Sequence, residues 1–260
     1  MPKKSLGQNF LSNPFILSKI IEASKITPDD IVVEIGPGQG ILTKMLTKAA
    51  HKVIAIELDP YLYEKLTAEF GGHDNIEILL GDALKYSYEE LETFKVVANI
   101  PYYITTPIIF RLIEVGDKMK SMTLTIQKEV AERIVARPGT KEYGVLSIAV
   151  RYFCEPRLEF IVPKEAFRPV PKVDSAVIHI ERLERPRVKV MDEKLFFRTV
   201  RTAFSQRRKT LSNSLRSVSE DIKSILLSAG IDPVRRAETL SIEEFARLSD
   251  IIKGLDLKSQ

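Results

Sequence analysis

The chain has 260 residues, of which 44% are hydrophobic and 28% charged, a composition typical of a soluble globular protein with ample material for a core. Its 39 Lys+Arg against 35 Asp+Glu give a net charge of +4, a mild excess whose location matters more than its size. No apolar run approaches ~20 residues and no apolar segment follows the basic Met1–Ser5, so we expect neither a transmembrane helix nor a secretory signal. The single cysteine, Cys154, cannot form an internal disulfide, and we expect it to be buried in a protein of the reducing cytoplasm.

The first twelve residues are basic, small and polar, with Phe10 and Leu11 as their only sizeable apolar pair. Two interpretations of this arm stay open: a disordered tail, or a segment that folds over a ligand. After it, Asn13-Pro14 is a helix-capping pair, and the apolar stripe that follows predicts a helix through about Ser24.

From Ile31 onward, apolar strands alternate with helices, which predicts an α/β fold with a parallel sheet and right-handed crossovers. The strands are expected at Ile31–Ile35, Val53–Glu57, Ile76–Leu80, Phe94–Ala98 and Met122–Ile126. The helices are expected at Gly40–Ala49, from Asp59-Pro60, and at Pro107–Val115, where Thr105-Thr106 would supply a threonine cap. Further helices are expected at Lys128–Arg137 and Gly144–Phe153, followed by an antiparallel edge pair at Leu158–Val162 and Ser175–Arg182.

The strand signal stops near Arg182–Arg187, and the remaining pattern is helical. Helices are expected at Glu193–Phe204, Thr210–Ser217, Ile222–Ala229 and from Ser241, which forms a capping box with Glu244. We therefore predict a domain over residues 1–185, including the 1–12 arm, and a small helical domain over residues 186–260.

A glycine-rich loop, Gly36-Pro37-Gly38-Gln39-Gly40, connects the first strand to a helix. Gly36 and Gly38 would let a ligand approach the backbone at the helix N-terminus. The dinucleotide fingerprint G-x-G-x-x-G fails here because position 41 is Ile41, and Pro37 removes an N–H donor that a pyrophosphate would need. The loop therefore suits a nucleoside cofactor without bridging phosphates, with S-adenosylmethionine (SAM) as the leading candidate; NAD and a plain tight turn are the alternatives.

Two carboxylates follow the next two strands. Glu57 ends the second strand, where it can accept hydrogen bonds from both ribose hydroxyls of SAM or of NAD. Asp82 follows the third strand and could accept from the adenine amino group, although such a residue is more often part of a turn.

Asn99-Ile100-Pro101-Tyr102 forms the loop after the fourth strand, at the sheet edge where open α/β folds bind ligands. The Asn99 amide oxygen can accept from an exocyclic NH2, and the Tyr102 ring can stack on a flat base. Pro101 would stiffen the turn between them. This loop predicts a site for a purine beside the cofactor.

Several motifs resemble those of the ribosomal RNA adenine N6-dimethyltransferases, in order and over nearly the whole chain. They are Gln8–Leu11, Glu34–Gly38, Glu57–Asp59, Gly81–Ala83, Asn99–Tyr102, Phe167–Ser175 and Phe204–Leu211. The long Phe-x-Pro-x-Pro-Lys-Val-Asp-Ser stretch looks like the bacterial small-subunit branch, whose loss is associated with kasugamycin resistance. One departure is Ser205, where that branch commonly has Asn.

The resemblance implies a Rossmann-like SAM-dependent methyltransferase domain with a small all-helical C-terminal domain. Its substrate would be two adjacent adenosines in a hairpin loop near the 3′ end of 16S rRNA, each methylated twice. Carried over by position, the SAM contacts fall on Asn9, Leu11, Gly36, Glu57, Asp82 and Asn99, beside the loop residue Gly38. The target adenine would be held by Asn99, the Ile100 carbonyl and Tyr102, with Phe167 either a second wall or a core residue.

RNA binding is expected from seven basic residues between Lys194 and Arg216, a stretch without an acid. A merely solvated helix face is the alternative. The predicted RNA contacts are Lys3, Lys4, Lys194, Arg198, Arg201, Arg207, Arg208 and Lys209.

Three other functions remain open at this point: a dimethyltransferase of 23S rRNA, a non-catalytic ribosome-assembly or transcription factor on the same fold, and an NAD oxidoreductase. Ile41 disfavours the last of these, and the intact Asn99–Tyr102 loop disfavours the second. His51, His73 and His179 lack a metal-ligand spacing, so we expect no metal site. We also expect a monomer whose partner is 16S rRNA within the small ribosomal subunit, with no membrane association.

Overall fold

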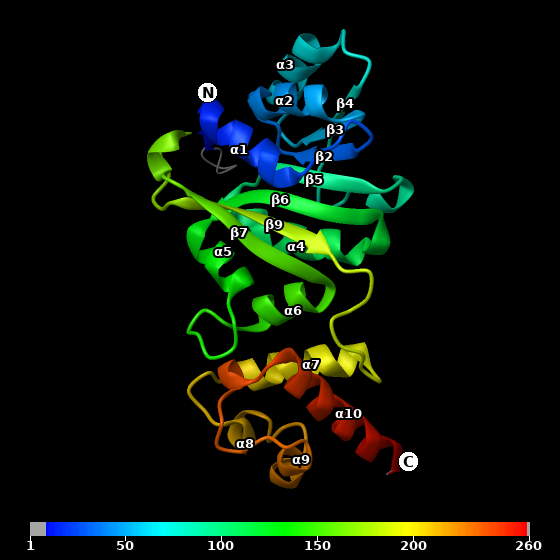
Figure 1. The fold of residues 1–260 in the computed structure, drawn as a ribbon, viewed down its shortest axis with the longest axis vertical. Coiled ribbons are helices and arrows are strands. Elements are labelled where there is room, and N and C mark those ends of the chain that lie inside the picture. Colours follow the sequence, from blue (N-terminus) through cyan, green and yellow to red (C-terminus); the bar gives the residue numbers. More distant parts are fainter. Residues whose placement is uncertain (1–8, 259–260) are drawn as a thin grey trace. The chain divides into compact units, whose positions relative to one another are not determined.

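The computed structural model describes residues 9–258, so Lys3 and Lys4 lie outside the described residues. The chain divides into two compact units (Figure 1). The first contains the chain up to Ala131 together with Glu155–Glu184, and the second contains Glu132–Cys154 together with the chain from Arg185 onward.

The first unit is built on a seven-stranded mixed sheet in the order β4-β3-β2-β5-β6-β9-β7. The strands are β2 (Ile31–Ile35), β3 (Lys52–Glu57), β4 (Ile76–Leu80), β5 (Phe94–Asn99), β6 (Met119–Gln127), β7 (Cys154–Val162) and β9 (Ser175–Arg182). The pairs β2–β3, β3–β4, β2–β5 and β5–β6 are parallel, and β9 is antiparallel to β6. The predicted parallel α/β sheet, with the two late strands adjacent at one edge, is therefore confirmed.

The helices of the first unit are α1 (Pro14–Ser24), α2 (Ile41–Ala49), α3 (Pro60–Phe70) and α4 (Thr105–Glu114). Two of them, α1 and α3, begin where their capping residues predict. Asn13 Oδ1 accepts from the N–H groups of Phe15 and Ile16, and Asp59 Oδ1 accepts from Tyr61 N–H. Side chains of α1 and α2 bury one face of the sheet in a core that contains Leu17, Leu46 and Val32.

The predicted threonine cap of α4 is wrong. The helix starts at Thr105 itself, its N-cap is Ile104, and no side chain caps it. Thr105 Oγ1 is buried and has no hydrogen-bond partner among the residues that the structure describes. The reason is the 3₁₀ turn η3 (Tyr102–Ile104), which leads the chain directly into the helix. An N-cap residue needs an extended backbone, and the backbone of Thr105 is already helical.

A two-stranded sheet outside the main one was not anticipated. It pairs β1 (Phe10–Leu11) antiparallel with β8 (Phe167–Arg168), so the described end of the N-terminal arm is fixed to a loop far along the sequence. Arg168-Pro169, at the end of β8, is a cis peptide. Of the two interpretations of the arm, the structure supports a folded one for residues 9–12.

The second unit is helical. Its elements are α6 (Val145–Phe153), α7 (Glu193–Phe204), α8 (Leu211–Ser214), α9 (Ile222–Ser228) and α10 (Ile242–Lys258), and α5 (Lys128–Val135) runs into it from the first unit. It also contains the 3₁₀ turn Ala237–Thr239, and the first unit contains such turns at Tyr88–Glu90, Gly116–Lys118 and Lys164–Ala166. The capping box of α10 is present, because Ser241 N–H donates to Glu244 Oε2 and Glu244 N–H donates to Ser241 Oγ.

The predicted boundary at residue 185 coincides with one of the two places where the chain passes between units, but residues 132–154 differ from the expectation. The strand–helix alternation continues through these residues and predicts that they belong to the sheet domain. Their apolar side chains instead share one core with the C-terminal helices, in which Ile148 and Tyr152 lie with Phe196 and Phe245. Arg151 adds hydrogen bonds to the carbonyls of Val135 and Ala136.

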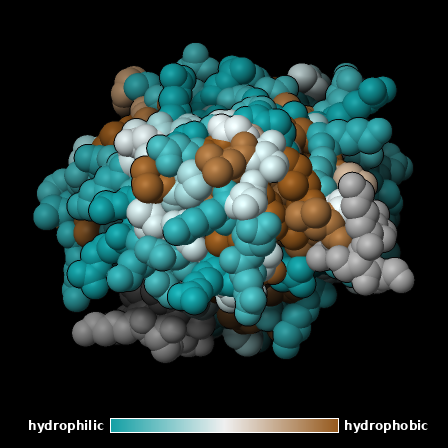
Figure 2. Space-filling view, turned by 90° about the horizontal axis from the view of Figure 1, so that it is seen from below, coloured by the Kyte–Doolittle hydropathy of each residue, from teal (hydrophilic) through white to brown (hydrophobic). Residues whose placement is uncertain are grey.

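Hydrophilic side chains dominate the surface seen in Figure 2, and hydrophobic patches interrupt them. Exposed large hydrophobic residues of the helical unit include Met191, Leu227 and Val234. Within residues 9–258, none of the helices is both long and apolar enough to span a membrane. Cys154 is buried, as expected, and forms no disulfide.

Candidate active site

The glycine loop after β2 is shaped by backbone that only glycine adopts easily. Gly36 has φ +68° and Gly38 has φ +59°, both in the left-handed region. Gly36 N–H donates to the Ile56 carbonyl at 2.9 Å, which ties the loop to β3. A Cβ on Gly38 would lie 2.9 Å from the Phe10 ring, so the arm packs closely on the loop.

Glu57 ends β3 and lies against this loop. Its Oε2 accepts from Gly38 N–H at 3.1 Å, and its Oε1 accepts from Asp59 N–H at 2.8 Å. Burial raises the pKa of Glu57 because the charged form loses solvation, and the two N–H donors oppose that shift. Each carboxylate oxygen has two lone pairs, so both can accept a further hydrogen bond from a ligand hydroxyl.

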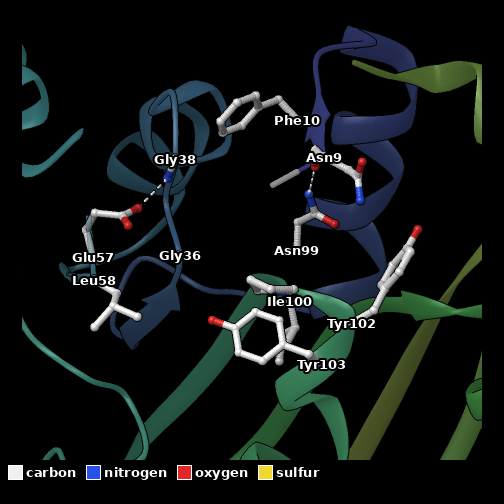
Figure 3. A pocket seen from close by; sticks show the side chains of 11 residues that line it. Asn9, Phe10, Gly36, Gly38, Glu57, Leu58, Asn99, Ile100, Tyr102 and Tyr103 are labelled. Carbon is white, nitrogen blue, oxygen red and sulfur yellow. Dashed lines mark hydrogen bonds between the residues drawn. The ribbon is translucent and has the colours of Figure 1, made fainter. Parts of the chain in front are cut away.

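Asn99, the last residue of β5, is oriented by the arm. Its side-chain Nδ2 donates to the backbone carbonyl of Asn9 at 2.9 Å (Figure 3). A carbonyl oxygen can only accept, so this contact fixes which end of the amide is nitrogen. The amide oxygen is therefore the end that a ligand can reach, and in Figure 3 it points toward the Tyr102 side of the crevice.

Tyr102 is held by Ser175, the last residue of the Phe167–Ser175 motif. Its hydroxyl lies 2.8 Å from Ser175 Oγ, at the start of β9, and Ser175 is fully buried. Burial raises the pKa of the Tyr102 phenol, which stays neutral at physiological pH. Ile100, between the two functional side chains, donates its N–H to the Thr125 carbonyl, and its side chain is buried.

These residues line one crevice at the carboxyl ends of β2, β3 and β5, as the strand order requires (Figure 3). Its lining includes Asn9, Gly36, Gly38, Glu57, Asn99, Ile100, Pro101 and Tyr102 from the predicted set. A smaller cavity adjoins it and shares Phe10, Gly36 and Asn99 with it; Leu11 and the buried Glu34 line this second cavity. The structure thus places the glycine loop, the carboxylate and the amide–aromatic pair around one space.

Phe167 does not line this space, and of its two expected roles, second wall or core residue, the structure supports the second. It is 0% exposed, it belongs to β8, and it lies in the same core as Leu11 and Val162. A ring with no exposed surface cannot contact a base, so we assign Phe167 to the core that anchors the arm.

Asp82 lies after β4, the strand next to β3, but outside the lining of both cavities. Its Oδ1 accepts from Leu84 N–H at 3.0 Å, as in a turn. Its contact with the cofactor adenine stays a prediction.

The predicted RNA contacts within the described part of the chain are all exposed: Lys194, Arg198, Arg201, Arg207, Arg208 and Lys209. The first three lie on α7, whose other face buries Leu195, Phe196 and Val200. Arg207 also has a structural contact, because its Nη2 donates to the carbonyls of Lys141 and Tyr143.

Sequence reasoning missed four residues of the site: Phe10, Leu58, Tyr103 and Ser175. Phe10, Leu58 and Tyr103 line the crevice, and Leu58 and Tyr103 are 47% and 56% exposed despite being apolar or aromatic. Each is adjacent in sequence to a predicted residue, which was the available signal. Nothing in the sequence indicated that Ser175 meets Tyr102, since 73 positions separate them. Among the described residues, no cluster of three or more His, Cys, Asp or Glu side chains could hold a metal ion.

The fold and the crevice define an α/β protein in which a glycine loop, a carboxylate and an amide–aromatic pair surround one space at the carboxyl ends of the strands. Within that class, the chain belongs to the ribosomal RNA adenine dimethylase family, whose model matches residues 2–254. The chain is 49% identical to ribosomal RNA small subunit methyltransferase A of Clostridium acetobutylicum, over 96% of this chain and 93% of that protein. The protein of the same name from Clostridium perfringens is 50% identical over 96% of this chain and 90% of its own length.

Solved structures agree with this membership. A dimethyladenosine transferase from Plasmodium falciparum matches with a TM-score of 0.78 and 32% identity, covering 92% of this chain and 95% of that one. The 23S rRNA methyltransferase ErmE matches with a TM-score of 0.76 and 28% identity, and the match covers 94% of this chain and 100% of that one. The predicted fold class, a Rossmann-like methyltransferase sheet followed by a small helical region, is confirmed.

Proposed function

We propose that this chain transfers methyl groups from SAM to N6 of two adjacent adenosines in the hairpin loop near the 3′ end of 16S rRNA, during maturation of the small ribosomal subunit in the cytoplasm. Membership of the adenine dimethylase family supports the reaction, and the names of the clostridial relatives support the small subunit as the substrate. The observation that carries the proposal is the orientation of Asn99: its amide nitrogen donates to the Asn9 carbonyl, which leaves the amide oxygen as the acceptor for a substrate N–H group.

The residues present fit SAM. Gly36 and Gly38 leave backbone without side chains beside the crevice, and Pro37 offers no N–H for a bridging phosphate. Glu57 would accept from the ribose hydroxyls, Asp82 from the adenine amino group, and Asn9 and Leu11 would cover the cofactor from the arm. When bound, SAM supplies an electrophilic sulfonium methyl group.

Adenine N6 is a poor nucleophile because its lone pair is delocalised into the ring. Asn99 Oδ1 and the Ile100 carbonyl would accept from the two N–H groups of N6, which favours the pyramidal amine of the transition state. The same contacts would aim the lone pair for in-line attack. The methylated amine is acidic enough to lose its proton to water, so no strong base is needed.

Tyr102 would stack on the extruded adenine, with the ring face stabilising the developing positive charge. Its hydrogen bond to Ser175 anchors the hydroxyl end of the ring, and so the direction of the side chain, before the base arrives. This preorganisation is a function for the buried serine at the end of the Phe167–Ser175 motif.

The test is incubation of the purified chain with labelled SAM and unmethylated small subunits, followed by nucleoside analysis of the mapped product. N6,N6-dimethyladenosine at two adjacent positions of 16S rRNA is the expected result. Label in 23S rRNA instead would assign the chain to the large subunit, and absence of label in either would reject the enzymatic proposal.

A further inference from the structure

The helical unit contains a cavity that no part of the proposed reaction uses. It has a volume of about 170 Å³, compared with about 60 and 30 Å³ for the two parts of the crevice. Its lining comes from the end of α5, the turn before α6 and the end of α7, and includes Arg133, Glu142, Gly144, Phe204 and Arg207.

The walls of this cavity are held in place by hydrogen bonds. Arg207 Nη2 binds the carbonyls of Lys141 and Tyr143, which closes the turn. Ser147 Oγ donates to the Arg133 carbonyl and accepts from Gly144 N–H at 3.1 Å. These hydrogen bonds connect the lining segments to one another.

Its chemistry combines cations with an aromatic surface. The lining residues include two arginines, Arg133 and Arg207, and one acid, Glu142, so together they carry a net positive charge. Arg207 uses only Nη2 for the turn, which leaves its Nε and Nη1 donors for an anion. Phe204, which is 8% exposed, meets Tyr143 edge to face with ring centroids 6.1 Å apart.

One of the lining residues, Gly144, has no side chain. Gly144 has φ −176°, an extended conformation that any residue adopts, so backbone strain does not require glycine here. A Cβ at this position would meet nothing within 4 Å, because it would project into open space. The exposed residues Arg208 and Lys209 directly follow Arg207 and extend the positive charge beyond the cavity.

We propose that this cavity holds one unstacked nucleotide of single-stranded RNA. Its phosphate would lie on Arg133 and Arg207, and its base would enter the cavity against Phe204, with Glu142 as an acceptor for base N–H groups. Single-stranded RNA is recognised in this way, by bases that are splayed out onto aromatic rings and arginine planes. The inference rests on the proposed function, since it identifies a second point of contact with the same rRNA.

The experiment fills the cavity without touching a charge. Full-length Gly144→Leu and its matched control Gly144→Ala are compared for binding to unmethylated small subunits at one salt concentration. We expect Gly144→Leu to lose about tenfold or more in affinity, and Gly144→Ala to bind as the unchanged chain does. The melting temperature and SAM affinity of both should stay unchanged. Arg133→Ala should weaken binding similarly, whereas Arg137→Ala, an exposed arginine outside the lining, should not.

Direct evidence comes from small subunits containing 4-thiouridine, cross-linked to the unchanged chain. A cross-link to peptides that contain Gly144 or Phe204 is the expected result. Normal binding by Gly144→Leu together with cross-links only elsewhere would overturn the nucleotide site and leave the proposed function intact. Failure of the unchanged chain to bind or methylate small subunits would reject the proposed function itself, and with it the nucleotide site.

Discussion

At the scale of single residues, Asn99 combines two tasks in one amide. Its nitrogen fixes the N-terminal arm through the Asn9 carbonyl, and its oxygen is left for the substrate. An aspartate could not do both, since a carboxylate oxygen would face the carbonyl with no proton to donate. The choice of asparagine thus follows from the geometry of the crevice.

We expect Asn99→Ala to retain SAM binding within a few fold and to lose at least about 100-fold in turnover, because a preorganised acceptor for the N6 hydrogens is gone. Calorimetric titration with SAM and single-turnover methylation of small subunits measure the two quantities. Unimpaired turnover in this variant would exclude the proposed role of the amide.

Glu34 is a buried acid beside the same crevice. It is 2% exposed, and its Oε2 has no hydrogen-bond partner among the described side chains and backbone. Burial raises the pKa of Glu34 to about 8, and the nearby charge of Glu57 adds to the rise. The folded chain therefore keeps this group protonated at neutral pH.

The unfolded chain releases that proton near pH 4.5, the ordinary value for Glu. The contribution of protonated Glu34 to the free energy of unfolding is therefore complete below pH 4.5. It is lost as pH rises to about 8, at about 1.4 kcal/mol per pH unit. The unchanged chain should therefore lose on the order of a few kcal/mol of its free energy of unfolding as pH rises. We expect Glu34→Gln, which has no proton to release, to lack this loss. Urea unfolding at pH 5.5, 7 and 9 tests this, and parallel pH profiles for the two chains would contradict it.

At the scale of elements, the pair β1–β8 explains why residues distant in sequence act together. It joins the arm to the loop before β9, so that Phe10 reaches Gly38 while Phe167 and Leu11 enter the core. Residues 9–11 are thereby part of the folded domain, and Asn9 and Phe10 form one wall of the crevice.

Phe167→Ala should lower the free energy of unfolding by about 3–5 kcal/mol, the usual cost of removing a buried ring. Tyr102→Ala is the matched comparison, since Tyr102 lines the crevice and is only partly buried. It should lose turnover with a smaller loss of stability. Denaturant titration and methylation assays of both variants separate a core residue from a base-stacking one; a stable but inactive Phe167→Ala would restore its role as a wall.

Local patterns were sufficient to predict most elements. The bounds of β2, β4, β9 and α7 match the expectation residue for residue, because apolar runs and caps act over a few positions. The same holds for the glycine loop and Asn99, which lie where a strand ends. Long-range choices were left open or missed: the partner of Phe10–Leu11, the choice between wall and core for Phe167, and the unit to which residues 132–154 belong. These depend on which apolar surfaces meet after folding, and no short pattern encodes that.

For the molecule as a whole, the position of charge matters more than its total of +4. The stretch from Lys194 to Arg216 concentrates seven cations without an acid, and its α7 members are exposed opposite a buried apolar face. Nucleic-acid phosphates are bound by such clusters through release of counterions, which makes affinity fall with salt.

Two triple variants test position against total charge. One variant changes Lys194, Arg198 and Arg201 to Gln. The other changes three exposed lysines of α2 and α3 to Gln, namely Lys44, Lys48 and Lys65. Both lower the net charge by three. We expect the first to weaken binding to small subunits and to reduce the slope of log affinity against log salt by about 2, since each lost phosphate contact removes ~0.7–0.9. The second should leave the slope nearly unchanged. Filter binding from 50 to 300 mM salt measures both; equal slopes for the two variants would mean that overall charge, and not the α7 face, attracts the RNA.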